Sequence, residues 1–131
     1  MRTEELRAEG KKIMNRNITI LTDVELITCI VQKGVGDKIT KAAFKAGAQG
    51  ATVHFAQGSG VREKLGILGI AVEAEKEIVQ IIVSTEQVDR IFDAIYLVGE
   101  LDTPGMGFMY VTSLEKAGTY IPQEVLEKLG V

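Results

Sequence analysis

Residues 25–33 read ELITCIVQK, a run of apolar and β-branched side chains that predicts a buried strand. Both alternating sets of side chains in this run are largely apolar, and the same holds for residues 76–83, KEIVQIIV. A sheet that helices cover on one side only is normally polar on its other side. The two runs therefore predict a sheet whose second face is buried against other subunits.

The chain repeats one order of elements twice: a strand, a helix, a glycine and a second strand. The expected strands cover residues 25–33, 51–56, 78–83 and 108–112, with residues 70–72 joining the third strand across the charged stretch 73–77. The expected helices begin at an N-cap Asp37 and near Thr85, end at Gly47 and Gly99, and are followed by a tail helix over residues 122–129. Because βαβ crossovers are right-handed, this order predicts the α+β class: a ferredoxin-like βαββαβ sandwich with a four-stranded antiparallel sheet, two helices on one face and a short C-terminal helix.

One domain suits a chain of 131 residues. Residues 3–16 are rich in Glu, Lys and Arg with weak helical periodicity, so residues 1–22 are expected to form an N-terminal arm or accessory helix. The domain itself is expected to cover residues 23–131. Within it, residues 58–69 combine several glycines with charged residues, which predicts a mobile loop.

Composition excludes several classes of protein. A formal net charge of −3 offers no basic surface for phosphates, so nucleic-acid binding is not expected. No apolar run approaches the ~20 residues of a membrane span, so membrane insertion is not expected either. The single cysteine, Cys29, lies within an apolar run and has no disulfide partner in the chain, which favours a core position and a reducing cytoplasmic location.

No set of catalytic residues stands out, and we do not expect an enzyme. The only histidine, His54, is in phase with Thr52 on its strand and is interpreted as an interface residue. Met106 and Met109 are interpreted as core rather than as metal ligands. Nucleotide hydrolysis would need a base, and Glu63 is the one candidate in the loop.

Two glycine-bearing turns remain as candidate sites, GSG at residues 58–60 and TPGMG at residues 103–107. Glycines allow main-chain amides to approach an anion closely, which suits phosphate binding. Most such turns are only tight turns. Neither of these two lies at the start of a helix, as a dinucleotide fingerprint requires. The turns alone therefore leave phosphate binding open.

The motifs GAQGATV at residues 47–53, GSG at 58–60 and GMGFMYV at 105–111 resemble those of the P-II nitrogen regulatory proteins. With the run at residues 76–83, the resemblance covers roughly residues 25–112. It implies a homotrimer whose sheets surround a central axis, with ATP or ADP bound in the clefts between subunits. It also implies that the loop over residues 58–69 grips a partner protein, such as a transporter or a metabolic enzyme.

The resemblance also implies site residues. Thr52 would hydrogen-bond the adenine, and the glycine turns would lie beside the ribose and phosphates. The nucleotide contacts are assigned to Thr52, Gly58, Gly60, Gly105, Met106 and Gly107, and an effector or anion site to Arg62, Lys64 and Lys76.

Departures from the family pattern change the expected ligand. Phe108 replaces the phosphate-binding lysine of the family, and its C-terminal arginines have no equivalents around Thr119 and Ile121. Each lost charge-assisted contact costs about 1.5–3 kcal/mol, so AMP, ADP or a cyclic nucleotide suits this chain better than ATP, and the need for Mg²⁺ is left open. Arg62 replaces the loop glutamine and the loop has no tyrosine, so regulation by uridylylation is not expected.

The sequence thus predicts a P-II-like signalling protein of nitrogen or carbon metabolism, with bicarbonate as a second effector near Arg62. The alternative is a structural trimer that resembles the divalent-tolerance proteins and senses no nucleotide.

Overall fold

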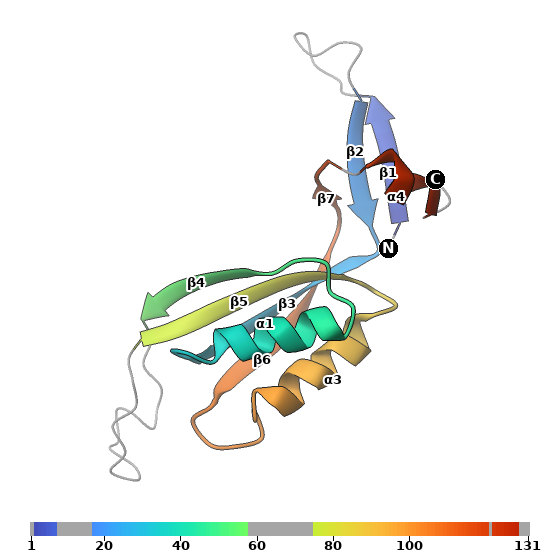
Figure 1. Cartoon of the computed structure of the whole chain (residues 1–131). Helices are drawn as coiled ribbons and strands as arrows, with labels where there is room; N and C mark the ends of the chain where they lie inside the picture. Colours follow the sequence, from blue (N-terminus) through green and yellow to red (C-terminus); the bar gives the residue numbers. More distant parts are fainter. Residues whose placement is uncertain (1, 8–16, 58–74, 121, 129–131) are drawn as a thin grey trace.

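The computed structural model describes residues 2–7, 17–57, 75–120 and 122–128. Its elements form two antiparallel sheets and a layer of helices (Figure 1). In chain order they are β1 (Arg2–Arg7), β2 (Asn17–Thr22), β3 (Val24–Gln32), α1 (Gly36–Lys45), β4 (Thr52–Gln57), β5 (Glu75–Ser84), α3 (Val88–Val98), β6 (Gly107–Leu114), β7 (Ala117–Gly118) and α4 (Gln123–Lys128).

The larger sheet has the strand order β4-β5-β3-β6, and all of its neighbours are antiparallel. Ile27 in the central strand β3 is paired with Ile81 of β5 on one side and with Val111 of β6 on the other. Helices α1 and α3 contact each other and lie on the same face of this sheet (Figure 1). The predicted ferredoxin-like βαββαβ fold is therefore confirmed.

The core lies between this sheet and the two helices. Alternate residues of β3 and β5 point into it, together with one face of each helix. Its fully buried members are Ile27, Cys29, Val31, Ile39, Ala43, Val79, Ile81, Ile91 and Ile95. Burial raises the pKa of the Cys29 thiol to about 12, because the thiolate would lose its hydration. Cys29 is thus an inert core residue, as predicted.

In the described part of the chain, no helix covers the opposite face of the larger sheet (Figure 1). Residues that alternate with the core set lie on it, and three apolar ones remain well exposed: Ile82 at 45%, Phe108 at 62% and Tyr110 at 41%. The rings of Phe108 and Tyr110 are in contact, with centroids 5.7 Å apart. Thr28 on the same face is buried, and its Oγ1 has no hydrogen-bond partner among the described residues. The apolar side chains that the sequence predicts for this face are present, and the burial of the face against other subunits stays a prediction.

The N-terminal segment differs from one of its two expected forms, the accessory helix. Arg2–Arg7 is a strand, not part of a helix, and it pairs with β2, which pairs in turn with β7. We call this three-stranded sheet the ribbon; it projects away from the larger sheet (Figure 1). The helix expectation was wrong because a polar segment with no apolar stripe can still form a strand when a β-branched neighbour supplies the pairing edge.

Element ends also differ in ways that have physical causes. Helix α1 begins at Gly36 after Val35, so Asp37 is not its N-cap, and the Asp37 carboxylate pairs instead with Lys41 at 2.9 Å. Strand β5 begins at Glu75, so residues 75–77 do not interrupt it as expected, while residues 70–72 lie outside the described part of the chain.

The charges at the start of β5 are accommodated by local partners. Lys33 forms an exposed ion pair with Glu75 at 2.9 Å. Glu77 is only 7% exposed, and its carboxylate accepts a hydrogen bond from the Gly34 N–H at the turn after β3. Paired or hydrogen-bonded carboxylates tolerate a strand position that lone ones do not.

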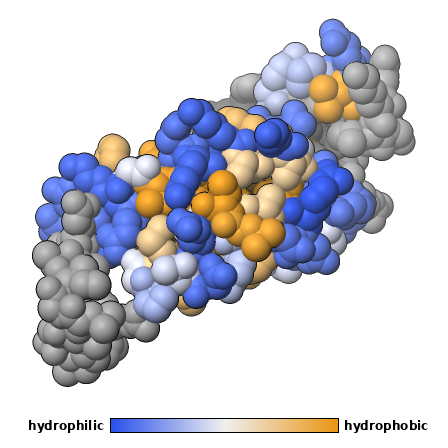
Figure 2. All heavy atoms as spheres, turned by 60° about the horizontal axis from the view of Figure 1, so that its bottom comes forward, coloured by the Kyte–Doolittle hydropathy of each residue, from blue (hydrophilic) through white to orange (hydrophobic). Residues whose placement is uncertain are grey.

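Hydrophilic residues dominate the side of the molecule seen in Figure 2, with an apolar patch near its centre. Within the described residues, no helix combines the length and the hydropathy needed to cross a membrane.

Candidate functional site

A pocket of about 500 Å³ lies where the larger sheet meets the ribbon. The larger sheet and the connection that leads into β4 provide one wall, and the ribbon with the residue after β7 provides the other. The wall on the sheet side consists of Gln49, Gly50, Ala51, Thr52, Gln80 and Ile82, and the wall on the ribbon side consists of Leu21, Ala117, Gly118 and Thr119. This volume lies in the range of small-molecule sites.

Thr52, the predicted adenine ligand, belongs to this pocket. It is the first residue of β4 and is paired with Gln80 in β5, so a hydroxyl and an amide lie on neighbouring strands of one wall. The chain reaches Thr52 directly from α1, whose end is held by a hydrogen bond of 2.9 Å from Arg90 Nε to the Ala46 carbonyl. Both the hydroxyl and the amide are therefore carried on secondary structure rather than on a free loop.

The chemistry of the pocket is neutral. None of its described lining residues is charged; Leu21 and Ile82 provide apolar surface, while Thr52, Gln80 and Thr119 provide hydrogen-bonding groups. Gly50 lines the pocket and has no atom within 4 Å of the position that a Cβ would take, so the space beside its main chain is open. An apolar cavity with a few polar groups suits an uncharged, flat heterocycle better than a phosphate.

The turn over residues 103–107 and Lys76 lie together at a different place. Gln32 joins them, because its Nε2 donates a hydrogen bond of 2.7 Å to the Gly105 carbonyl and its Oε1 accepts one of 3.4 Å from Lys76 Nζ. Gly105 and Gly107 both have positive φ, at 81° and 150°. Two predicted parts of the site, the phosphate turn and the lysine, are therefore neighbours in the fold.

Thr52 and Gly107 do not meet within one chain. They lie on the two outer strands of the sheet, three strand spacings apart, which is about 14 Å. They are also three residue rows apart along the strands, a further ~10 Å, because Thr52 shares a row with Gln80 while Gly107 shares one with Glu77. One ligand could contact both only if each belongs to a different subunit.

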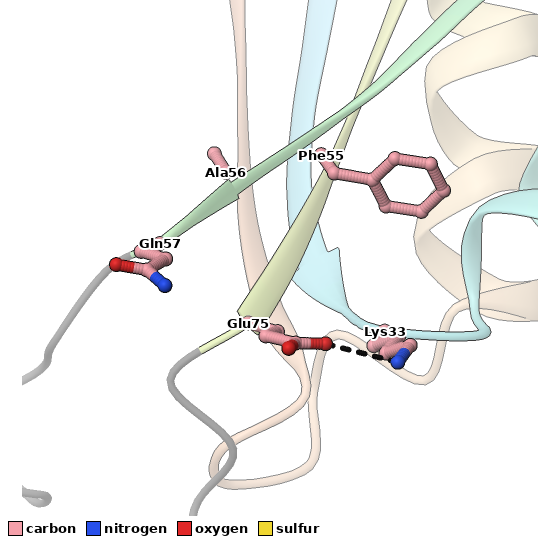
Figure 3. Close-up of a pocket in the computed structure, with 5 residues that line it drawn as sticks. All are labelled: Lys33, Phe55, Ala56, Gln57 and Glu75. Atoms are coloured by element: carbon pink, nitrogen blue, oxygen red, sulfur yellow. Dashed lines mark ion pairs between the residues drawn. The ribbon is translucent and has the colours of Figure 1, made fainter.

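A second pocket, of about 420 Å³, lies at the end of the sheet where β4 ends and β5 begins (Figure 3). Phe55, Ala56 and Gln57 of β4 line it, with Glu75 of β5 and Lys33, which directly follows β3. Phe55 is 76% exposed, and the Lys33–Glu75 ion pair lies beside it (Figure 3).

The remaining predicted site residues, Gly58, Gly60, Arg62 and Lys64, lie outside the described residues. Met106 is half-buried in the glycine turn, and His54 is exposed on β4 in phase with Thr52. Among the described residues, no group of three or more His, Cys, Asp or Glu side chains could hold a metal ion.

Among the residues of these sites that were not predicted are Leu21, Gln32 and Gln80. A signal for Gln80 was present, because it is a polar residue in the middle of the apolar run 78–83. Gln32 and Leu21 gave no such signal, since their roles depend on strand pairing that the sequence does not show.

Comparisons with known proteins agree with this fold. The model of the family "Nitrogen regulatory protein P-II" matches residues 24–124. No curated protein matches the chain. Among solved structures, that of Arabidopsis thaliana PII bound to citrate is similar, with a TM-score of 0.55 and 19% identity over 72% of this chain and 79% of that one. At this level of identity the similarity shows a shared fold.

Proposed function

Because the chain belongs to the nitrogen regulatory protein P-II family, we propose that it is a signalling protein that binds an adenine nucleotide in the clefts of a homotrimer. AMP, ADP or a cyclic nucleotide is the proposed ligand, and ligand occupancy changes how a partner protein is held. The regulated process belongs to nitrogen metabolism or to bicarbonate-linked carbon metabolism.

The pocket that contains Thr52 is the observation that carries this proposal. Its volume of about 500 Å³ accommodates an adenine and a ribose. Its hydroxyl and amide groups can hydrogen-bond the ring nitrogens and the amino group of adenine, while Ile82 and Leu21 provide apolar surface for the ring. Since the described lining residues carry no charge, the phosphates must find their partners elsewhere.

The uncovered face of the larger sheet supports the homotrimer. Phe108 and Tyr110 expose apolar rings there, and Thr28 Oγ1 is a buried hydroxyl without a hydrogen bond among the described residues. Contact between copies would cover the rings and could satisfy that hydroxyl. It would also allow the turn at Gly105 and Gly107 of one subunit to approach the Thr52 pocket of another.

The loop over residues 58–69 remains our proposed contact with the partner protein. The residues on either side of the undescribed segment, Gln57 and Glu75, line the second pocket (Figure 3). Lys76 follows directly and reaches the Gly105 carbonyl through Gln32. This short chain of contacts is a physical route by which a ligand at the glycine turn could bias the loop.

Isothermal titration calorimetry with AMP, ADP, ATP and cyclic AMP tests the proposal. Thr52→Val keeps the β-branched shape and removes the hydroxyl, so affinity should fall about ten-fold. Thr40→Val is the matched control, because the Thr40 hydroxyl bonds to the Gly36 carbonyl within α1 and does not line the pocket. Absence of binding by every adenine nucleotide would overturn the proposal and leave the structural trimer as the better interpretation.

A further inference from the structure

We infer that the N-terminal hairpin β1–β2 completes the nucleotide pocket, with Leu21 as a residue that determines which ligand fits. This inference rests on the proposed function, because it assigns the second wall of the same pocket. It concerns a part of the chain that precedes the family match, which begins at residue 24.

Strand pairing places Leu21 at the pocket. Leu21 pairs with Ala117 and Ile20 with Gly118, so β2 and β7 together form the wall that faces Gly50 and Thr52. Leu21 is only 8% exposed and lines the pocket, whereas Ile20, also 8% exposed, does not line it. Neighbouring residues of one strand point to opposite faces, which explains why only one of them reaches the pocket.

The connection to the sheet sets the direction in which the hairpin leaves it. Strand β2 continues into β3 through Asp23, which adopts a left-handed φ of 54° and whose carbonyl accepts a hydrogen bond of 3.0 Å from the Thr85 N–H. Val24, the next residue, is almost fully buried. The hairpin is thus aimed by a defined kink, and Leu21 lies two residues before it.

A ligand in this pocket contacts both sheets at once. Binding energy that is shared between the ribbon and the larger sheet must stabilise their docking, and the docked ribbon must raise affinity by the same factor. Leu21 is apolar and its neighbours Ala117 and Gly118 present mainly main chain, so this wall recognises the heterocycle and not the phosphates. Adenosine and ADP should therefore respond equally to changes in the ribbon wall.

Two substitutions in β2 distinguish the effect of losing pocket lining from the effect of destabilising the ribbon. Leu21→Ala and Ile20→Ala each remove a buried side chain of β2, but only the first removes pocket lining. We expect Leu21→Ala to lower the affinity for ADP and for adenosine by the same factor, about ten-fold, and Ile20→Ala to change it less than about two-fold. If Ile20→Ala loses as much affinity as Leu21→Ala, the hairpin acts only through its folding and the assignment of Leu21 is overturned.

Two residues allow the pocket to be filled from either wall. Ala117 in the ribbon wall pairs with Leu21 and therefore carries its side chain on the same face, while Gly50 in the sheet wall has no atom within 4 Å of the position that a Cβ would occupy. Ala117→Leu should abolish most ADP binding, and its urea midpoint reports any separate loss of stability. Hydrogen exchange of the β2 and β7 amides should slow when ADP is added to the wild type.

The outcomes distinguish the two proposals. If the wild type binds no adenine nucleotide, the proposed function fails and the assignment of the hairpin fails with it. If the wild type binds ADP and Gly50→Val abolishes binding, while Leu21→Ala and Ala117→Leu bind normally, the function stands and the inference on the hairpin is overturned.

Discussion

Three glycine-to-alanine substitutions separate backbone strain from crowding in this fold. At Gly107 the φ of 150° is unfavourable for alanine, and an added Cβ would lie 2.6 Å from the Ile30 carbonyl oxygen and 2.9 Å from Val31 Cγ1. At Gly105 the φ of 81° is also unfavourable, but nothing lies within 4 Å of the added Cβ. Gly50 has neither problem.

The expected losses of unfolding free energy follow from these differences. Gly105→Ala should cost about 1–2 kcal/mol, the usual penalty of a left-handed residue. Gly107→Ala should cost about 3–5 kcal/mol, because a backbone penalty of ~1–3 kcal/mol adds to an overpacking penalty of ~1–3 kcal/mol. Gly50→Ala should be neutral or stabilising by less than about 1 kcal/mol, since it reduces the entropy of the unfolded chain.

Urea unfolding monitored by circular dichroism gives the midpoints, at one fixed chain concentration because an oligomer unfolds in a concentration-dependent way. No nucleotide is added, so that the loss of a ligand contact cannot contribute. Equal midpoints for Gly105→Ala and Gly107→Ala would refute the close approach of β6 to the Ile30 carbonyl. A large loss in Gly50→Ala would refute the open space beside the pocket.

Three further predictions concern the core, the start of β5 and the uncovered face. Cys29 keeps its proton up to a pKa of about 12, whereas the unfolded thiol loses it near 9.0. The free energy of unfolding is therefore unaffected by Cys29 below pH 9 and falls by ~1.4 kcal/mol per pH unit above it. By pH 10.5 the wild type should have lost about 2 kcal/mol of unfolding free energy relative to Cys29→Ala, as measured by urea titration. Parallel pH curves for the two proteins would contradict this. Glu77→Ala should lower the free energy of unfolding by about 1–3 kcal/mol, because it leaves a main-chain N–H unpaired. Glu75→Ala breaks an exposed ion pair and should cost less than ~1 kcal/mol. Equal urea midpoints for the two variants would count against the buried hydrogen bond. Light scattering should give three times the chain mass of 14.2 kDa for the wild type. Tyr110→Asp on the uncovered face should reduce that mass, whereas Tyr96→Asp on α3 should not. A monomeric wild type would refute the trimer.

The strands and helices of the larger sheet could be predicted because their residues carry strong local signals. The runs at residues 25–33 and 78–83 are β-branched and apolar on both alternating faces, and α3 has an apolar stripe that ends at Gly99. The starts of elements were less predictable. Asp37 has the side chain of an N-cap, yet the turn after β3 starts the helix at Gly36, because Glu77 from a distant strand holds the Gly34 N–H.

The ribbon could not be predicted from residues 2–7, which have no apolar alternation. A signal did exist in NITILT at residues 17–22, whose β-branched residues favour a strand. One wall of the candidate pocket depends on this ribbon, so the sequence pointed to Thr52 but not to Leu21. Long-range pairing, such as that of Leu21 with Ala117, has no local signature.

The ribbon and the larger sheet are joined by two separate strand connections, Asp23 between β2 and β3 and the short segment between β6 and β7. A rigid body that is tethered at two points keeps a single rotational freedom, about the line through both tethers. A pull on β1 would therefore be carried through β2 to the Leu21 wall and would load the contact between the ribbon and the larger sheet.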